Sequence, residues 1–223
     1  MELLLSKISH PAFPLTGAGA IKNIIFDYGG VICNIDVKIT ERCFAEMGFK
    51  VNDPDYPTTA LKPIIDRLEA GAITPQQFRD ALKPFFSVPV TDQQLNDAWN
   101  ALLLDMPAPR IRLLDEVRKS FRIFMLTNTN EIHYHTYRQR FQDQYGYSDF
   151  DGLFEKAYYS YRMGLMKPDP EIFRMLAADR NLRPGETLFI DDTLMHVEGA
   201  NVAGMHAHHL RVTEGAQIME LFG

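Results

Sequence analysis

The residues of this 223-residue sequence that could carry chemistry come directly after short apolar runs typical of buried strands in a parallel sheet. Three such runs end in polar side chains, namely Asp27, Thr127 with Asn128, and Asp191 with Asp192. In an open parallel sheet, ligands bind outside the carboxyl ends of the strands, so we expect these side chains to meet at one edge. Lys167, in a loop just before a predicted helix, is expected to join them.

Three carboxylates in a dry cleft repel one another and shift to the neutral form unless a cation holds them. Ligands that are all oxygen favour Mg²⁺, which usually shares its coordination shell with a phosphate. Thr127 and Lys167 offer a hydrogen-bond donor and a positive charge, and both suit a phosphate. Asp27 beside a metal-bound phosphate would have the geometry for nucleophilic attack on phosphorus. The residues therefore predict phosphoryl chemistry through an aspartyl-phosphate.

Strand and helix patterns alternate along the second half of the sequence, which predicts an α/β, doubly wound, Rossmann-like parallel sheet. Between the first two strong strands the patterns are all helical, and they include two Thr-x-x-Gln capping boxes, at Thr74 and Thr91. We therefore predict three parts: an N-terminal tail at 1–20, an α/β core at 21–37 and 106–223, and an inserted helical cap at 38–105.

Four segments, taken in order, resemble the four motifs of the haloacid dehalogenase-like (HAD) hydrolase superfamily. They are IIFDYGGVI, FMLTNTN, the lysine of GLMKPDP, and LFIDDTLMHVEGA, and together they span about residues 24–204. The helical insertion stands where that superfamily carries a C1 cap. The sequence most resembles the branch that contains the α-D-glucose-1-phosphate phosphatases and the N-terminal phosphatase domain of soluble epoxide hydrolases.

The resemblance implies a metal site and a nucleophile. Asp27 is then the nucleophile and a ligand of Mg²⁺, and Gly29 offers its backbone carbonyl to the metal. Asp192 resembles the direct ligand of the fourth motif, whereas Asp191 resembles a ligand that acts through water or a neighbour. The phosphoryl group is then held by Thr127, Asn128 and Lys167.

The sequence departs from the superfamily pattern at Gly29, where most members carry an acid/base aspartate. Acid–base catalysis typically contributes about 10²–10⁴-fold, so its loss would slow turnover. Histidine titrates in the right range to replace it. We hypothesise that His133, which follows the second motif closely, lies near the leaving group of the substrate.

The favoured function is Mg²⁺-dependent hydrolysis of a small phosphate monoester, a sugar phosphate such as a hexose 1-phosphate. One alternative is a phosphoryl-binding or regulatory protein with little turnover, which the glycine at 29 would fit. Another is a 2-haloacid dehalogenase, which needs no metal; the paired Asp191 and Asp192 argue against it.

The composition indicates which kinds of partner and which cellular compartment to expect. The net charge of −6 argues against nucleic-acid binding, which needs a basic footprint. No apolar run approaches the ~20 residues of a membrane span, and the first ten residues are too short and polar for a secretory signal. Two cysteines cannot form a disulfide framework, so we expect a reducing cytoplasm. The favoured function implies a small phosphorylated metabolite as the partner. The oligomeric state is not readable from the sequence.

Overall fold

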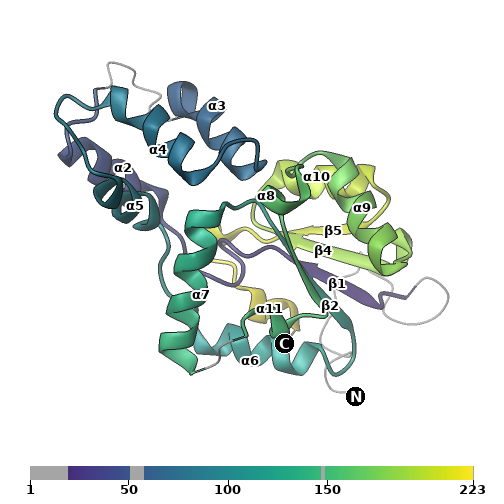
Figure 1. The fold of residues 1–223 in the computed structure, drawn as a ribbon. Helices are drawn as coiled ribbons and strands as arrows, with labels where there is room; N and C mark the ends of the chain where they lie inside the picture. Colours follow the sequence, from purple (N-terminus) through teal and green to yellow (C-terminus); the bar gives the residue numbers. More distant parts are fainter. Residues whose placement is uncertain (1–19, 51–57, 147–148, 223) are drawn as a thin grey trace.

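The computed structural model of the chain describes residues 20–50, 58–146 and 149–222 (Figure 1). The tail predicted at 1–20 lies outside the described residues, apart from Ala20. Of the helices that are described, none combines the length and the apolar character that a membrane crossing requires.

A five-stranded parallel sheet forms the centre of the fold, with the strand order β3-β2-β1-β4-β5. The strands are β1 (Asn23–Phe26), β2 (Arg122–Thr127), β3 (Lys156–Tyr159), β4 (Thr187–Asp191) and β5 (His206–His209). Phe26 stands opposite Met125 on one side and Ile190 on the other. Because the strands are in register at this point, the residues that follow them emerge at one edge of the sheet.

Helices cover both faces of the sheet, as the alternation of side chains along each strand requires. Ile24 and Phe26 point into the apolar core under α6 (Ala108–Val117), α7 (Glu131–Tyr145) and α11 (Ile218–Phe222). Ile25 points to the opposite core, under α9 (Pro170–Arg180) and α10 (Leu194–Val202). The doubly wound α/β fold predicted from the sequence is confirmed.

Four helices between β1 and α6 form a block with a core of its own, which we call the helical block. They are α2 (Val37–Glu46), α3 (Thr58–Glu69), α4 (Pro75–Leu82) and α5 (Asp92–Asn100). Both predicted capping boxes are present, at Thr74 and at Thr91, and they fix where α4 and α5 begin. Phe44, Phe78 and Trp99 are buried in the apolar cluster of the block.

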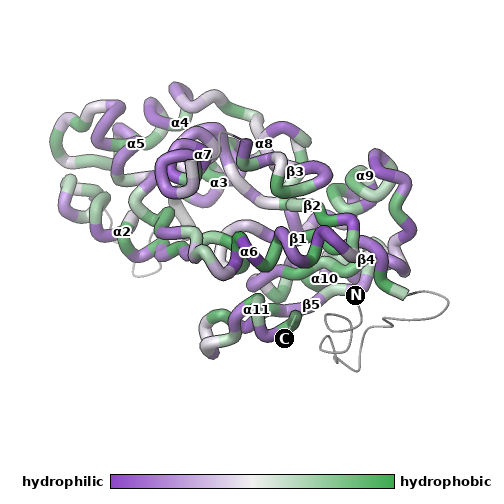
Figure 2. Tube along the Cα trace, turned by 90° about the horizontal axis from the view of Figure 1, so that it is seen from below, coloured by the Kyte–Doolittle hydropathy of each residue, from purple (hydrophilic) through white to green (hydrophobic). Residues whose placement is uncertain are grey.

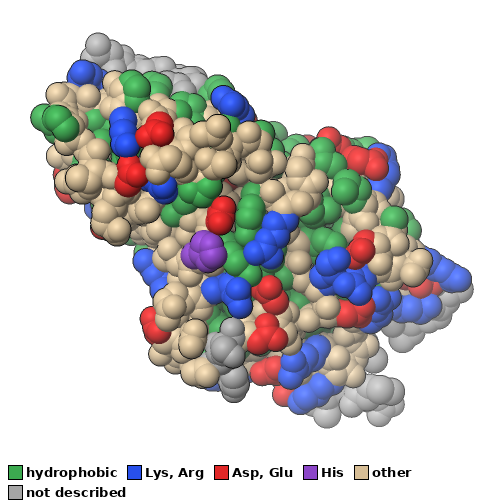
Figure 3. All heavy atoms as spheres, viewed as in Figure 1, with side chains coloured by type: hydrophobic (Ala, Val, Ile, Leu, Met, Phe, Trp, Pro, Cys, Tyr) green, Lys and Arg blue, Asp and Glu red, His purple; other side chains and the backbone are tan. Residues whose placement is uncertain are grey.

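In two views at right angles, the helical block lies to one side of the sheet, with α7 at the junction (Figures 1 and 2). The short helix α8 (Ser160–Met163) follows β3 directly. Single 3₁₀ turns complete the described elements, at Lys83–Phe85, Asp151–Leu153, Pro184–Glu186 and Val212–Glu214. Acidic and basic side chains are interspersed over the face of the molecule shown in Figure 3.

Candidate active site

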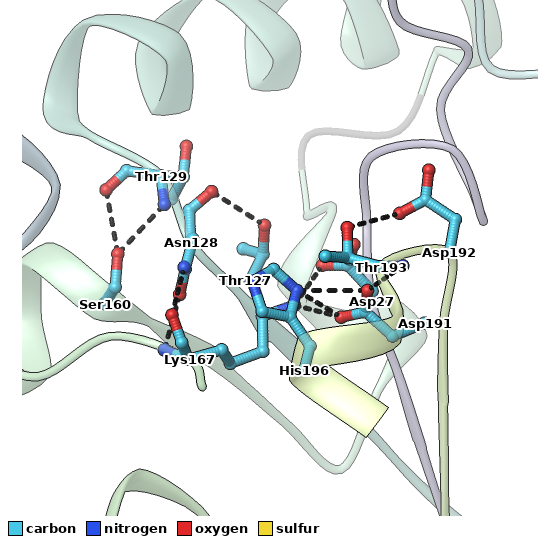
Figure 4. Close-up of polar contacts among 10 residues, drawn as sticks. All are labelled: Asp27, Thr127, Asn128, Thr129, Ser160, Lys167, Asp191, Asp192, Thr193 and His196. Atoms are coloured by element: carbon cyan, nitrogen blue, oxygen red, sulfur yellow. Dashed lines mark hydrogen bonds and ion pairs between the residues drawn. The ribbon is translucent and has the colours of Figure 1, made fainter. Parts of the chain in front are cut away.

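Lys167 joins two of the predicted carboxylates at the edge of the sheet (Figure 4). Its Nζ donates hydrogen bonds to Asp27 Oδ1 at 2.7 Å and to Asp191 Oδ2 at 2.6 Å. The side chains of Lys167 and Asp191 are almost completely buried, and that of Asp27 nearly so. The structure therefore brings together residues that lie up to 164 positions apart in the sequence, since Asp191 pairs through Lys167 with Asp27.

The loop that carries Lys167 is fixed by its neighbours. The Asn128 side chain donates to the Lys167 carbonyl at 2.9 Å and accepts from the Lys167 backbone N–H at 2.9 Å. Gly199 of α10 packs against the carbonyl of Pro168, and a Cβ at Gly199 would come within 2.1 Å of that oxygen. The side chain of Asn128, which the resemblance assigns to the phosphoryl group, thus positions the lysine.

The three aspartates form one carboxylate cluster: Asp27, Asp191 and Asp192 each offer an oxygen, and these oxygens lie within 4.8 Å of one another. Gly30 makes this approach possible, because it has a φ of +74° and a Cβ there would lie 2.2 Å from Asp192 Oδ2. The second glycine of the first motif is therefore required by a contact with a residue from the far end of the chain.

Asp191 is fully engaged by its surroundings. Besides Lys167, it accepts a hydrogen bond from the Thr193 backbone N–H at 2.8 Å, and His196 Nδ1 lies 3.1 Å from both of its oxygens. Asp192 is less buried, and within the part of the chain that the structure describes its carboxylate accepts a single hydrogen bond, from the Thr193 hydroxyl at 3.3 Å. Asp192 is therefore freer than Asp191 to turn an oxygen to a ligand.

Burial and charge set the ionisation of the cluster. Burial raises the pKa of Asp27 from an ordinary 3.8 to about 7, and the charge of Asp191 adds to the rise. Burial acts on Asp191 too, but Lys167 and His196 lower its pKa to about 2. Burial opposes the charge of Lys167, yet Asp191 and Asp27 together raise its pKa. One lysine thus holds one carboxylate ionised, and Asp27 needs further positive charge nearby to ionise fully.

The donor set fits Mg²⁺. Three carboxylates from two strand ends converge, and all their ligand atoms are oxygens. Gly29, two residues after Asp27, lines a cavity at the strand ends. Burial and the charge of Asp191 also raise the pKa of Asp192, so a divalent cation would relieve the same repulsion at two of the three groups.

A cavity of about 350 Å³ lies between the strand ends and the helical block. On the core side it is lined by Gly29, Thr127, Asn128 and His133. The side formed by the helical block is largely apolar, with contributions from Val37, Phe44, Leu61, Ile65 and Trp99, and Ile35, which precedes α2, extends it. Three ionisable side chains join this apolar wall, namely Glu41, Lys62 and Glu69.

His133 lines the cavity but is tied to the helical block. Its ring stacks on Trp99 with centroids 5.0 Å apart, and its Nδ1 lies 3.1 Å from Asn100 Oδ1. Burial, assisted by Arg140, lowers the pKa of His133 to about 3. The imidazole is therefore neutral near pH 7, which makes it a poor proton donor in the role we hypothesised.

Sequence reasoning missed two features of the site. His209 Nε2, on β5, lies 3.0 Å from the carbonyl of Asp192. Glu69, the last residue of α3, faces the cavity from the helical block. No local signal marks either residue, because each acts across a contact between distant segments.

The chain belongs to the haloacid dehalogenase-like hydrolase family, whose model matches residues 21–204. It is 30% identical over 173 residues to a D-ribitol-5-phosphate phosphatase of Bacteroides thetaiotaomicron, with 77% of this chain and 83% of that protein covered. It is 26% identical to a sesquiterpene phosphatase of Aspergillus oryzae, with 85% and 89% covered. The family resemblance seen in the four motifs is confirmed.

Solved structures give the same result. A HAD family enzyme from Bacteroides thetaiotaomicron superposes with a TM-score of 0.77 and 35% identity, covering 85% of this chain and 93% of that one. The same enzyme in complex with magnesium and inorganic phosphate gives a TM-score of 0.74 and 34% identity, with 85% and 94% covered.

Proposed function

We propose that the chain is a Mg²⁺-dependent phosphatase that hydrolyses a small phosphate monoester through an aspartyl-phosphate. The observation that carries the proposal is the contact of Lys167 with Asp27 and Asp191, beside Asp192, at the carboxyl edge of the sheet. The relatives that are phosphatases, and the similar enzyme that holds magnesium with phosphate, support it.

In this proposal Asp27 attacks phosphorus in line through the oxygen that Lys167 does not bind. Lys167 and Thr127 hold the phosphoryl oxygens, and the positive charge of Lys167 offsets the charge that develops there. Asp27, Asp192 and the Gly29 carbonyl would hold Mg²⁺ directly, and Asp191 through water. Bound by these residues, the cation would neutralise charge and would keep Asp27 ionised. Water then attacks the phosphoryl group on Asp27, which releases phosphate.

In this proposal the helical block is the cap of the site, and the cap domain is the segment at about 38–105 that the sequence predicts. It supplies half of the cavity wall, and Trp99 Nε1 donates to Asn130 Oδ1 of the core at 3.4 Å. A closed cap excludes bulk water, which strengthens the electrostatic interactions inside and protects the intermediate from side reactions.

A sugar or sugar-alcohol phosphate is the first substrate candidate, by analogy with the D-ribitol-5-phosphate phosphatase. The apolar wall favours a second class, in which the phosphate is attached to a hydrophobic skeleton, as in the relative that is a sesquiterpene phosphatase. A sugar presents several hydroxyl groups that need partners, yet Thr40 already donates its hydroxyl to the Ala98 carbonyl at 2.8 Å. Lys62 is likewise paired with Asp66 at 2.5 Å.

The test is phosphate release from a panel of hexose 1-phosphates, sugar-alcohol phosphates and prenyl phosphates, with Mg²⁺ or with a chelator. We expect release that needs Mg²⁺ and that Asp27→Asn abolishes. Release that survives the chelator or the substitution would contradict the mechanism. Tight phosphate binding without any turnover would favour the phosphoryl-binding alternative, and halide release from a 2-haloacid would favour the dehalogenase.

A further inference from the structure

The proposed reaction lacks a proton donor among the residues next to the nucleophile. The leaving oxygen of an alkyl phosphate is strongly basic and needs a proton as its bond to phosphorus breaks. Gly29 has no side chain, His133 is neutral, and Lys167 is occupied by two carboxylates. A proton donor for the leaving group must therefore come from another wall of the cavity.

Glu69 is the ionisable side chain that best meets this requirement. It is the last residue of α3, and it lines the cavity that Gly29 and Thr127 also line. Within residues 20–50, 58–146 and 149–222, its carboxyl group makes no hydrogen bond and no ion pair. A partly buried carboxyl without a partner is costly, so its presence in the wall of a site points to a task.

The turn after α3 holds Glu69 against the core. Gly71 has a φ of +67°, and a Cβ there would lie 2.1 Å from the carbonyl oxygen of Tyr161. The turn thus packs directly on the backbone of α8, six residues before Lys167. This contact ties the end of α3 to the same segment that delivers the lysine to the carboxylate cluster.

The charges around Glu69 suit a proton donor. Burial raises its pKa from 4.5 to about 7, the Asp66 carboxylate raises it further, and the positive charges of Lys167 and Lys62 oppose the rise. The influence of Lys167 on this pKa agrees with the position of Glu69 in the wall of the cavity. Of the other ionisable side chains on the cavity, Glu41 stands on α2, Lys62 is paired with Asp66, His133 stands on α7, and Tyr28 follows Asp27 directly.

We propose that Glu69 is the general acid and base of the reaction, supplied by the helical block in place of a side chain at position 29. This inference rests on the proposed phosphatase function. As Asp27 forms its bond to phosphorus, the bond to the leaving oxygen breaks, and the carboxyl proton of Glu69 moves to that oxygen. The Glu69 carboxylate then takes a proton from the water that attacks the phosphoryl-Asp27. Phosphate leaves, and Asp27 and protonated Glu69 are restored.

The experiment compares two leaving groups in wild type and in Glu69→Gln, with Mg²⁺ present. For the best alkyl phosphate of the panel, kcat/KM should fall by roughly 10²- to 10⁴-fold. For p-nitrophenyl phosphate it should change little, because the aryl oxygen leaves without a proton. Glu46→Gln, the same exchange at an exposed position of α2, should change neither. An equal loss for both substrates, or no loss for the alkyl ester, would overturn the role of Glu69.

Two further variants keep the result interpretable. The general acid must be protonated for the first step, so kcat/KM of the wild type for the alkyl ester should fall as pH rises above about 7. This limb should persist in Glu69→Asp and vanish in Glu69→Gln. Gly29 has no strained φ, and a Cβ there meets only the end of the Ile35 side chain at 3.1 Å. Gly29→Asp should therefore restore alkyl phosphate turnover to Glu69→Gln.

The proposal would be overturned if Gly29→Asp did not restore turnover to Glu69→Gln and if the fall in kcat/KM above pH 7 were still present in Glu69→Gln. A different result would bear on the proposed function instead: if the wild-type chain released phosphate from neither substrate, the phosphatase assignment itself would fail. The two failures are thus distinguished by the wild-type activity, which is measured before any variant is compared.

Discussion

The two sides of the cavity differ in chemical character: the strand ends form a buried polar network, and the helical block forms an apolar wall. At the strand ends, Lys167 and Asp191 are almost completely buried and each makes at least two polar contacts. The helical block offers an apolar wall, and its Glu69 has no partner among the described residues. A buried network of hydrogen bonds is rigid, so the loss of one member is costly, whereas an apolar wall can be rebuilt. We infer that the sheet supplies the nucleophile and the metal ligands, whereas the helical block shapes the substrate cavity and adds the proton donor Glu69.

The largest expected effect is at the nucleophile. Asp27→Asn keeps the shape of the side chain but removes its nucleophilic charge, so kcat should fall by roughly 10⁴- to 10⁶-fold. Steady-state phosphate release with Mg²⁺ measures this loss. Residual activity near the wild-type level would show that the strand ends do not perform the chemistry, and the contrast between the two sides would be lost.

Gly30→Ala is expected to have the next largest effect. The new Cβ would displace the Asp192 carboxylate, so the affinity for Mg²⁺ should fall by roughly 10- to 100-fold. Gly146→Ala is the matched control, because its φ of +73° is similar but, among the described residues, no atom lies within 4 Å of the added Cβ. Both variants should lose about 1–2 kcal/mol of stability. Mg²⁺ titrations of activity that gave the same affinity for both variants would contradict the account.

Removal of Mg²⁺ should cost stability in a pH-dependent way. Raising the pH from about 4 to about 7 ionises Asp27 in the unfolded chain, while the folded chain still keeps the proton because its pKa is about 7. The folded state therefore loses stability through this window, and above it bears the full cost of the buried charge. Mg²⁺ should raise the melting temperature more at pH 8 than at pH 5. An equal rise at both values would place the ion elsewhere.

The smallest effect is expected at His133, on the junction between the two sides. His133→Ala removes the stacking on Trp99 and the contact with Asn100, which should cost about 1–3 kcal/mol of stability. The shape of the pH–rate profile between pH 5 and pH 8 should stay the same, because the imidazole is neutral throughout. A lost limb in that profile would instead assign the proton transfer to His133.

The sequence was sufficient to predict the sheet and the residues at its strand ends. Asp27, Thr127 and Asp191 each follow an apolar run, and the topology of a parallel sheet then brings them together. The roles of Gly30 and Glu69 could not be predicted from the sequence, because each depends on a close approach between segments far apart in the chain. Local patterns report on strands and caps, but they do not report which side chain a helical insertion turns to the site.

The central claim is that Asp27 carries the phosphoryl group, and trapping that intermediate tests it most directly. Glu69→Gln should slow hydrolysis of the intermediate, so the phosphoryl-enzyme should accumulate when this variant turns over p-nitrophenyl phosphate with Mg²⁺. An acid quench then preserves it. Mass spectrometry of the peptide that contains Asp27 should then show a phosphoryl adduct on that residue, absent in Asp27→Asn. Sustained Mg²⁺-dependent turnover with no adduct, or an adduct on another residue, would contradict the account.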